Sequence, residues 1–286
     1  MKSTAKKIIA AAFAAMIAVS PVMAGGKTDG DDGVKVVKVG VTSDDPRLWD
    51  AVQAELDARG KRIKIQTVYF DGGGRVNQST ADNELDLNAF QHYAFYNLNA
   101  KELKLEDQLT PVAETLIVPL NLFSNRDKNY RTPSELPNGA SIIIPDDPTN
   151  EGRALSLLES AGLIKINPAV GLNGQPKDII SNPKNLKFIE IFGPQIPRSL
   201  PDADAGVINA GIAVDAGFDL NTDAIFKLDI DATNPSLKPF FNIIVAKTRD
   251  KDAQWVADIR EAYYTKRVAD AIGVIYKNAA IPVFKY

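Results

Sequence analysis

The chain has 286 residues, of which 45% are hydrophobic and 24% are charged, and its formal net charge is −3. This balance is typical of a globular protein with a hydrophobic core, and the lack of a basic run argues against a nucleic-acid partner. Cysteine is absent and His92 is the only histidine, which excludes disulfides, cysteine nucleophiles, zinc–thiolate sites, lipid attachment through a cysteine and clusters of histidine around a metal.

The first 24 residues have the pattern of a secretory signal peptide. Three lysines are followed by the uncharged apolar run 8–19, and the small residues Val22 and Ala24 predict cleavage before Gly25. The alternative is an uncleaved membrane anchor, but the run is short for a bilayer span. We therefore expect an exported protein, whose formal charge without the three leader lysines is −6.

Residues 25–33 (GGKTDGDDG) consist of glycine, threonine and charged side chains, and they predict a flexible linker. The apolar density of 34–41 then predicts a strand. A turn at 44–46 (DDP) leads into a helix that ends at Gly60, because the following side chains share one helical face: Trp49, Val52 and Leu56.

The same order returns about a hundred residues later. A strand is predicted at 140–145, a second DDP turn at 146–148, and a helix that ends at Gly162. In this turn Asp147 is suited to cap the helix while Pro148 takes its first position. The repeated strand–turn–helix order favours two similar α/β units, although chance also explains three shared residues.

Further strand candidates alternate with helical segments, which predicts an α/β architecture. Two such lobes, with ligand at the carboxyl ends of the strands, would form a cleft. The other predicted strands are 63–70, 85–90, 114–124, 185–192, 205–214 and 240–247, and the segment 253–276 is predicted to be helical.

A candidate anion site lies at the start of the second helix. Free N–H groups and partial positive charge at a helix start attract anions. Arg153 stands one turn in, and its planar fork can hold a carboxylate with two parallel hydrogen bonds. The alternative is a surface arginine paired with Glu151 or another acid.

Two asparagines are candidates for polar ligand contacts. Asn209 ends the apolar strand AGVIN, where an amide can face a cleft. Asn242 interrupts the apolar run FFNIIVA and needs a partner if it is buried. The alternatives are a turn asparagine at 209 and a backbone partner at 242.

The single histidine lies in an aromatic stretch, LNAFQHYAFYN (87–97). Strand alternation predicts Asp86, Asn88, Phe90 and His92 on one side. An aromatic wall of this kind suits an apolar or sulfur-bearing ligand side chain, while the alternative is core packing under a loop.

Enzyme signatures are scarce in the sequence. There is no G-x-S-x-G elbow and no G-x-x-x-x-G-K-[ST] loop, and the glycines at 72–74 lack the spacing of a dinucleotide loop. An exported hydrolase has no identifiable nucleophile–base pair, so we do not expect an enzyme.

Four segments together resemble the methionine-binding, NlpA-type substrate-binding proteins of ABC importers. They are IPDDPTNEGRALSLLESAGLIKI (144–166), LDLNAFQH (85–92), PKDIISNPKNLKFIEI (176–191) and QIPRSLPDADAGVIN (195–209). The resemblance covers nearly the whole mature chain. It implies a two-lobed periplasmic-binding-protein fold with a hinge and a ligand, typically L-methionine, enclosed between the lobes.

The resemblance also implies roles for particular residues. Phe90 and His92 match the pocket wall F-Q-H, and Arg153 matches the arginine that holds the ligand carboxylate. Asn209 and Asn242 match asparagines that contact the amino-acid backbone of the ligand. Phe95 stands in the same wall, at a position that is usually tyrosine.

Three positions depart from the family pattern where tyrosine is usual: Gly73, Phe95 and Ile212. The loss of hydroxyls and bulk favours a larger or less selective site, so methionine, a related amino acid and a short peptide all stay open as ligands. Relatives usually carry a lipid-bearing cysteine at the cleavage site, whereas Gly25 follows Ala24 here. We therefore expect a protein that is free in the periplasm, or released from the cell if that cell has no outer membrane.

The expected molecule is a monomeric solute receptor that delivers its ligand to an ABC permease, without cofactor or metal. The first lobe is predicted to comprise 34–118 and 240–286, and the second 119–239. The alternative function is an exported surface or adhesion protein that keeps the fold without ligand binding linked to transport.

Overall fold

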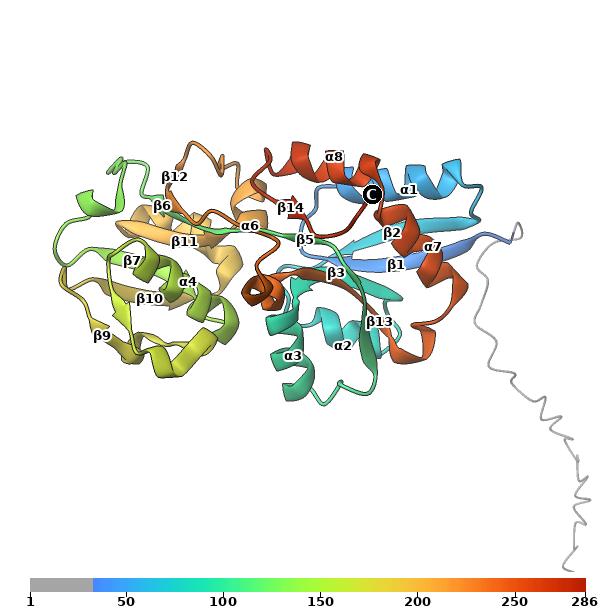
Figure 1. Ribbon diagram of the computed structural model, residues 1–286, viewed down its shortest axis with the longest axis horizontal. Helices are drawn as coiled ribbons and strands as arrows, with labels where there is room; N and C mark the ends of the chain where they lie inside the picture. The colour runs from blue at the N-terminus through green and yellow to red at the C-terminus, as the bar shows by residue number, and fades with distance from the viewer. Residues whose placement is uncertain (1–32) are drawn as a thin grey trace, which may run out of the picture.

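A computed structural model describes residues 33–286. The predicted signal peptide and all but the last residue of the predicted linker lie outside the described residues. Two five-stranded sheets stand side by side along the long axis of the molecule (Figure 1). We call the part built around the first sheet lobe 1 and the part built around the second sheet lobe 2.

The sheet of lobe 1 has the order β2-β1-β3-β13-β4. β1 pairs in parallel with β2 and β3, and β13 is antiparallel to β3 and β4. The C-terminal part of the chain therefore completes the sheet that the N-terminal part begins. The strands are β1 (Lys35–Val41), β2 (Ile63–Tyr69), β3 (Leu87–His92), β4 (Leu109–Glu114) and β13 (Asn242–Lys247).

Helices cover both faces of this sheet (Figure 1). Buried side chains of α1, α7 and α8 pack with β1 on one face, and α3 packs with β13 on the other. The helices are α1 (Arg47–Ala58), α2 (Val76–Ala81), α3 (Tyr93–Glu102), α7 (Gln254–Tyr263) and α8 (Lys266–Ile275). The predicted face of α1 is confirmed, since its buried residues are Trp49, Val52 and Leu56.

Lobe 2 repeats this topology with the strand order β10-β7-β11-β6-β12. β7 is parallel to β10 and β11, and β6 is antiparallel to β11 and β12. The strands are β6 (Leu120–Ser124), β7 (Ser141–Pro145), β10 (Lys187–Ile191), β11 (Ala205–Asn209) and β12 (Ala224–Lys227). A further small sheet pairs β8 (Lys165–Ile166) with β9 (Ile179–Ser181).

One face of the second sheet packs against α4 (Pro148–Ser160), and the other against α5 (Ile196–Ser199) and α6 (Ala210–Asp215). α4 starts as predicted: Pro148 is in the first turn, and the N–H of Asn150 donates to the capping carboxylate of Asp147 at 3.0 Å. The predicted strand 205–214 is wrong beyond Asn209. The chain turns there into α6, which buries Ala210 and Ala213.

The chain crosses between the lobes after β5 (Leu116–Ile117) and again before β13 (Figure 1). β5 pairs with β14 (Ile281–Pro282), so the C-terminal segment lies against the first crossing. The predicted lobe boundaries at 118/119 and 239/240 fall near these crossings and stay a prediction. Over residues 33–286, no helix combines the length and the apolarity that a membrane span requires.

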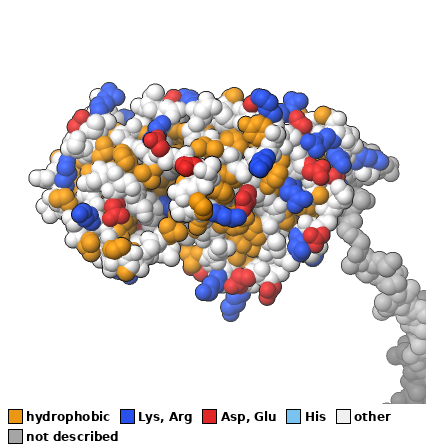
Figure 2. Space-filling view, viewed as in Figure 1, with side chains coloured by type: hydrophobic (Ala, Val, Ile, Leu, Met, Phe, Trp, Pro, Cys, Tyr) orange, Lys and Arg blue, Asp and Glu red, His pale blue; other side chains and the backbone are white. Residues whose placement is uncertain are grey.

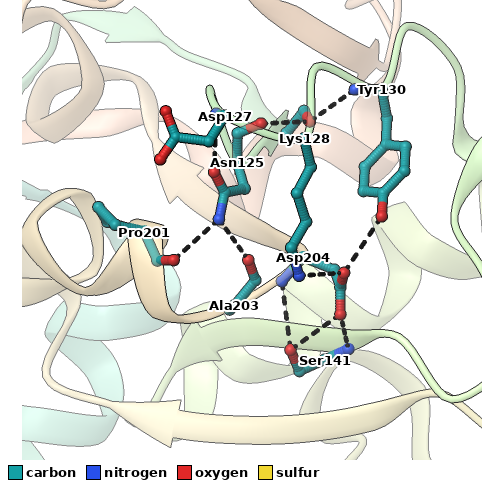
Figure 3. Close-up of polar contacts among 9 residues, drawn as sticks. Asn125, Asp127, Lys128, Tyr130, Ser141, Pro201, Ala203 and Asp204 are labelled. Atoms are coloured by element: carbon teal, nitrogen blue, oxygen red, sulfur yellow. Dashed lines mark hydrogen bonds and ion pairs between the residues drawn. The ribbon is translucent and has the colours of Figure 1, made fainter.

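A polar cluster around Asp204 ties together the outer ends of three strands of lobe 2 (Figure 3). The carboxylate of Asp204 accepts from the N–H and hydroxyl of Ser141 at 2.8 and 3.1 Å, from Lys128 at 2.6 Å and from Tyr130 at 3.2 Å. Asn125, at the end of β6, donates to the carbonyls of Pro201 and Ala203. These bonds join the end of β6 to the starts of β7 and β11.

We predict that Asp204→Asn lowers the free energy of unfolding by about 1–3 kcal/mol, because it removes a charged acceptor of four donors. Burial alone would raise the pKa of Asp204, but the hydrogen bonds from Lys128 and Ser141 outweigh it, and the pKa is lowered. The stabilisation is therefore present above the unfolded pKa of about 4 and is lost as the pH falls through the folded pKa.

Urea denaturation at several pH values measures this effect. The matched control is Asp127→Asn, because Asp127 lies in the same loop with an exposed side chain and only its backbone N–H is bonded, to Asn125. Equal stability of the two variants at neutral pH would contradict the prediction.

Candidate functional site: the cavity between the lobes

A cavity of about 580 Å³ lies between the lobes. Its lining comes from the segments that follow the carboxyl ends of β1, β3, β7 and β11, together with the start of β13. This is where α/β sheets usually bind ligands. All six residues predicted for the site line this one cavity: Phe90, His92, Phe95, Arg153, Asn209 and Asn242. Their role in binding stays a prediction.

Arg153 projects from the second turn of α4. Its Nη1 donates to Oδ1 of Asn150 at 3.0 Å, and its Nη2 donates to the carbonyl of Val118 at 3.0 Å. Its Cζ lies 4.9 Å from the centroid of the Phe240 ring. Two of the five N–H donors of the guanidinium are therefore bonded to protein, and the others remain available to a ligand.

Arg153 has no counter-ion at close range. Among residues 33–286 no carboxylate oxygen lies within 4.0 Å of its guanidinium, so the alternative of a surface pair with Glu151 does not hold. Burial lowers the pKa of Arg153 to about 10, against the opposing effect of the more distant Asp147. The side chain stays a cation at neutral pH, held by neutral groups.

Asn150 is a central residue that the sequence reasoning did not select. Its Oδ1 accepts from Arg153 at 3.0 Å, from Nδ2 of Asn209 at 2.9 Å and from Nε2 of His92 at 3.4 Å. Three of the predicted site residues therefore meet at one amide oxygen. The available signal was its position in the first turn of the helix, three residues before Arg153.

The two predicted asparagines have different environments. Asn209 is at the end of β11, where its amide is engaged by Asn150. Asn242 starts β13 and pairs with His92 in the sheet. Its backbone carbonyl accepts from Thr115 at 2.8 Å, while its side-chain amide forms no hydrogen bond with the described residues. That amide is therefore free to meet a ligand.

His92 is a structural residue as well as part of the wall. Its Nδ1 accepts from the N–H of Phe95 at 3.1 Å and so caps α3, which leaves the proton on Nε2, towards Asn150. Its ring packs edge-on against Phe240. Burial, followed by the charge of Arg153, lowers the pKa of His92 to about 3, so the imidazole is neutral at physiological pH.

The predicted alternation along 86–92 is wrong at Asn88. The pairing of β3 with β13 shifts register near Ala89, and such a bulge reverses the side to which the following residues point. Asn88 consequently shares a side with Gln91, to which it is hydrogen-bonded, and both bond to Asn77 of α2. Phe90 and His92 both line the cavity, as predicted.

The aromatic wall is compact at Gly73. Phe90 and Phe95 pack edge-to-face with centroids 5.7 Å apart. A Cβ atom at Gly73 would overlap the Phe90 ring, and one at Gly72 would overlap the Phe192 ring of lobe 2. Phe90 therefore occupies the space that a tyrosine at position 73 would need. The loss of a tyrosine at Gly73 consequently enlarges the cavity less than the sequence suggests.

Contacts between the lobes border the cavity. His92 meets Asn150, the hydroxyl of Ser43 donates to Asp215 at 2.9 Å, and Gly72 lies against Phe192. Across the part of the chain that the structure describes, no group of three His, Cys, Asp or Glu side chains is placed to hold a metal. The arrangement is suited to hold a carboxylate and an apolar side chain.

A family model described as "NlpA lipoprotein" matches residues 37–284. The chain is similar to the probable D-methionine-binding lipoprotein MetQ of Haemophilus influenzae, with 34% identity over 86% of each chain. It is also similar to the D-methionine-binding lipoprotein MetQ of Salmonella typhimurium, with 33% identity over 86% of this chain and 87% of that protein.

Solved structures agree with these relatives. The substrate-binding protein of a methionine transporter from Streptococcus pneumoniae has a TM-score of 0.79 and 33% identity, with 87% of this chain and 96% of that chain covered. A nutrient-binding protein from Burkholderia cenocepacia bound to methionine has a TM-score of 0.77 and 32% identity, with 87% and 100% covered. The predicted two-lobed fold is confirmed.

The family model and the relatives thus both extend over most of the sequence, and the chain belongs to the NlpA lipoprotein family.

Proposed function

We propose that this chain is the substrate-binding protein of an ABC importer and that it encloses methionine, a related amino acid or a short peptide in the cavity between its lobes. Named relatives bind D-methionine, and a solved neighbour holds methionine. The lobes close over the ligand by a hinge motion, and the closed form delivers it to a membrane permease.

The observation that carries this proposal is the isolated charge of Arg153. A buried cation without a carboxylate partner is costly, and a ligand carboxylate in the cavity would supply that partner. The free N–H groups of the guanidinium are suited to a two-bond grip on a planar carboxylate. Phosphate-binding loops and nucleophile–base pairs have no counterpart in the sequence, so we propose a binding protein and not an enzyme.

The remaining predicted residues orient the ligand. Asn209 and the unengaged amide of Asn242 meet the α-amino end. Six aspartates and two arginines line the cavity, and this excess of acid favours the ligand ammonium. Phe90, Phe95 and the edge of His92 form the wall of the side-chain pocket, where an apolar or thioether side chain packs well.

We propose a monomer that is exported to the periplasm, with lobe 1 formed by 34–118 and 240–286 and lobe 2 by 119–239. Relatives are named lipoproteins, whereas this sequence has no cysteine to carry a lipid.

On the face in Figure 2, lysine and arginine side chains are interspersed with acidic ones over both lobes. Such mixing offers no basic stripe for nucleic acid. The alternative of a surface protein without ligand binding is not favoured by the methionine-binding relatives.

We predict that Arg153→Ala weakens L-methionine binding by about 2–5 kcal/mol, roughly a 30- to 4,000-fold increase in Kd, because the ligand carboxylate is left buried without its partner. Isothermal titration calorimetry measures the change. Arg131→Ala is the control, since Arg131 is an exposed residue of the same lobe. Unchanged affinity in the Arg153 variant would refute the site.

We predict that L-methionine affinity is constant between pH 5 and pH 7. The only histidine is the one side chain whose ordinary pKa lies in this range, and burial lowers the pKa of His92 to about 3. Protonation would add a positive charge near Arg153 and remove the cap of α3, so binding weakens only below the range tested. A drop in affinity with a midpoint near pH 6.5 would show that His92 titrates normally.

We predict that Gly73→Ala reduces affinity for L-methionine by about 1–3 kcal/mol, because the added Cβ displaces the Phe90 ring from its place in the wall. The control is Gly74→Ala, where a Cβ meets no atom within 4 Å. Ligand-induced thermal shifts of the two variants, compared at equal L-methionine concentration, test the effect. Identical shifts would mean that the Phe90 ring is not part of the binding wall.

A further inference from the structure

Asn150 has an orientation that the surrounding groups fix. Its Nδ2 donates to both carboxylate oxygens of Asp147, at 3.1 and 3.0 Å. An ionised carboxylate can only accept, so the amide must present its nitrogen to Asp147 and its oxygen to the opposite side. The residue is 9% exposed. The amide oxygen therefore faces the cavity groups with little freedom to turn.

That oxygen has more donors than it can satisfy fully. A carbonyl oxygen has two lone pairs, and three groups approach it. The two short bonds, from Arg153 at 3.0 Å and Asn209 at 2.9 Å, come from lobe 2, while the long one, from His92 at 3.4 Å, comes from lobe 1. Opening the lobes breaks only the weakest of the three and leaves Asn150 with two donors.

We propose that Asn150 is a positioning residue for the anion site: its side-chain oxygen aligns Arg153 and Asn209 within lobe 2 and accepts His92 when the lobes close. The inference rests on the proposed function and adds a residue to it. Alignment by Asn150 keeps the guanidinium in place before a ligand arrives. Because Asn150 also contacts His92, closure of the lobes and binding of the ligand carboxylate then depend on the same side chain.

Two substitutions separate alignment from folding. Asn150→Ala removes the shared acceptor but keeps the backbone N–H that bonds to Asp147, so α4 still has its cap. Asn150→Asp puts a carboxylate beside Arg153, where it forms an internal ion pair and competes with the ligand. It also replaces the amide group that donates to Asp147 by an oxygen that the Asp147 carboxylate repels. The control is Asn173→Asp, which makes the same charge change at an exposed position of lobe 2.

We expect L-methionine to bind about tenfold more weakly to Asn150→Ala and about 100-fold more weakly to Asn150→Asp, with no change in the control. Calorimetry measures these affinities. Circular dichroism melting of the unliganded variants checks that each is folded at the temperature used. Affinities of both variants within twofold of the wild type would overturn the proposal.

A second readout needs no ligand, because the single histidine gives one set of imidazole signals in NMR spectra. Between pH 4.5 and pH 8 we expect no titration of His92 in the wild-type protein or in Asn150→Ala. In Asn150→Asp the new carboxylate raises the pKa of His92, so a titration enters this range. A His92 signal that is the same in the wild type and in Asn150→Asp would overturn the contact between these residues.

The two readouts keep two failures distinct. A wild-type protein that binds no amino acid, while His92 responds to Asn150→Asp, would refute the proposed function and leave the contact standing. A wild-type protein that binds L-methionine, while both variants bind it equally well, would refute the role of Asn150 alone.

Discussion

The isolated positive charge of Arg153 is the constraint around which the cavity is organised. Removing a cation from water is expensive, and attraction to a carboxylate is the usual compensation. Here the charge is stabilised instead by the side-chain carbonyl of Asn150, the backbone carbonyl of Val118 and the face of the Phe240 ring. Dipoles and ring electrons stabilise the charge without cancelling it. A ligand anion therefore meets a cation that is already in position and already partly desolvated.

The duplicated topology makes this arrangement possible. Each sheet has parallel strands on one side, whose carboxyl ends point to the same gap, and antiparallel strands on the other side. Side chains from three distant parts of the sequence, at His92, Arg153 and Asn209, can then meet at one atom of Asn150. Along residues 33–286 the chain crosses between the lobes twice, so the separation of the lobes can change while each sheet stays intact.

Much of the fold could be predicted from local chemistry. The apolar spacing of α1 and the Asp–Pro start of α4 can be recognised within their own segments, without knowledge of tertiary contacts. The family resemblance led to six residues that line one cavity. Features that depend on tertiary contacts could not be predicted. The bulge in β3 results from pairing with β13, which is 150 residues away. The role of Asn150 depends on donors from three elements, and the Phe240 ring under Arg153 comes from a segment beside the second crossing. Likewise, the glycines at 72–74 do not reveal that the rings of Phe192 and Phe90 fill the space beside Gly72 and Gly73.

Gly72 has a consequence for the range of the hinge motion. Its backbone is left-handed, with φ at +85°, and the Phe192 ring of the opposite lobe rests against it. At this point nothing but a hydrogen atom separates the chain from the approaching ring. Any side chain at position 72 would therefore meet the Phe192 ring. It would keep the lobes from closing fully at this edge of the cavity, even with every ligand contact inside the cavity left unaltered.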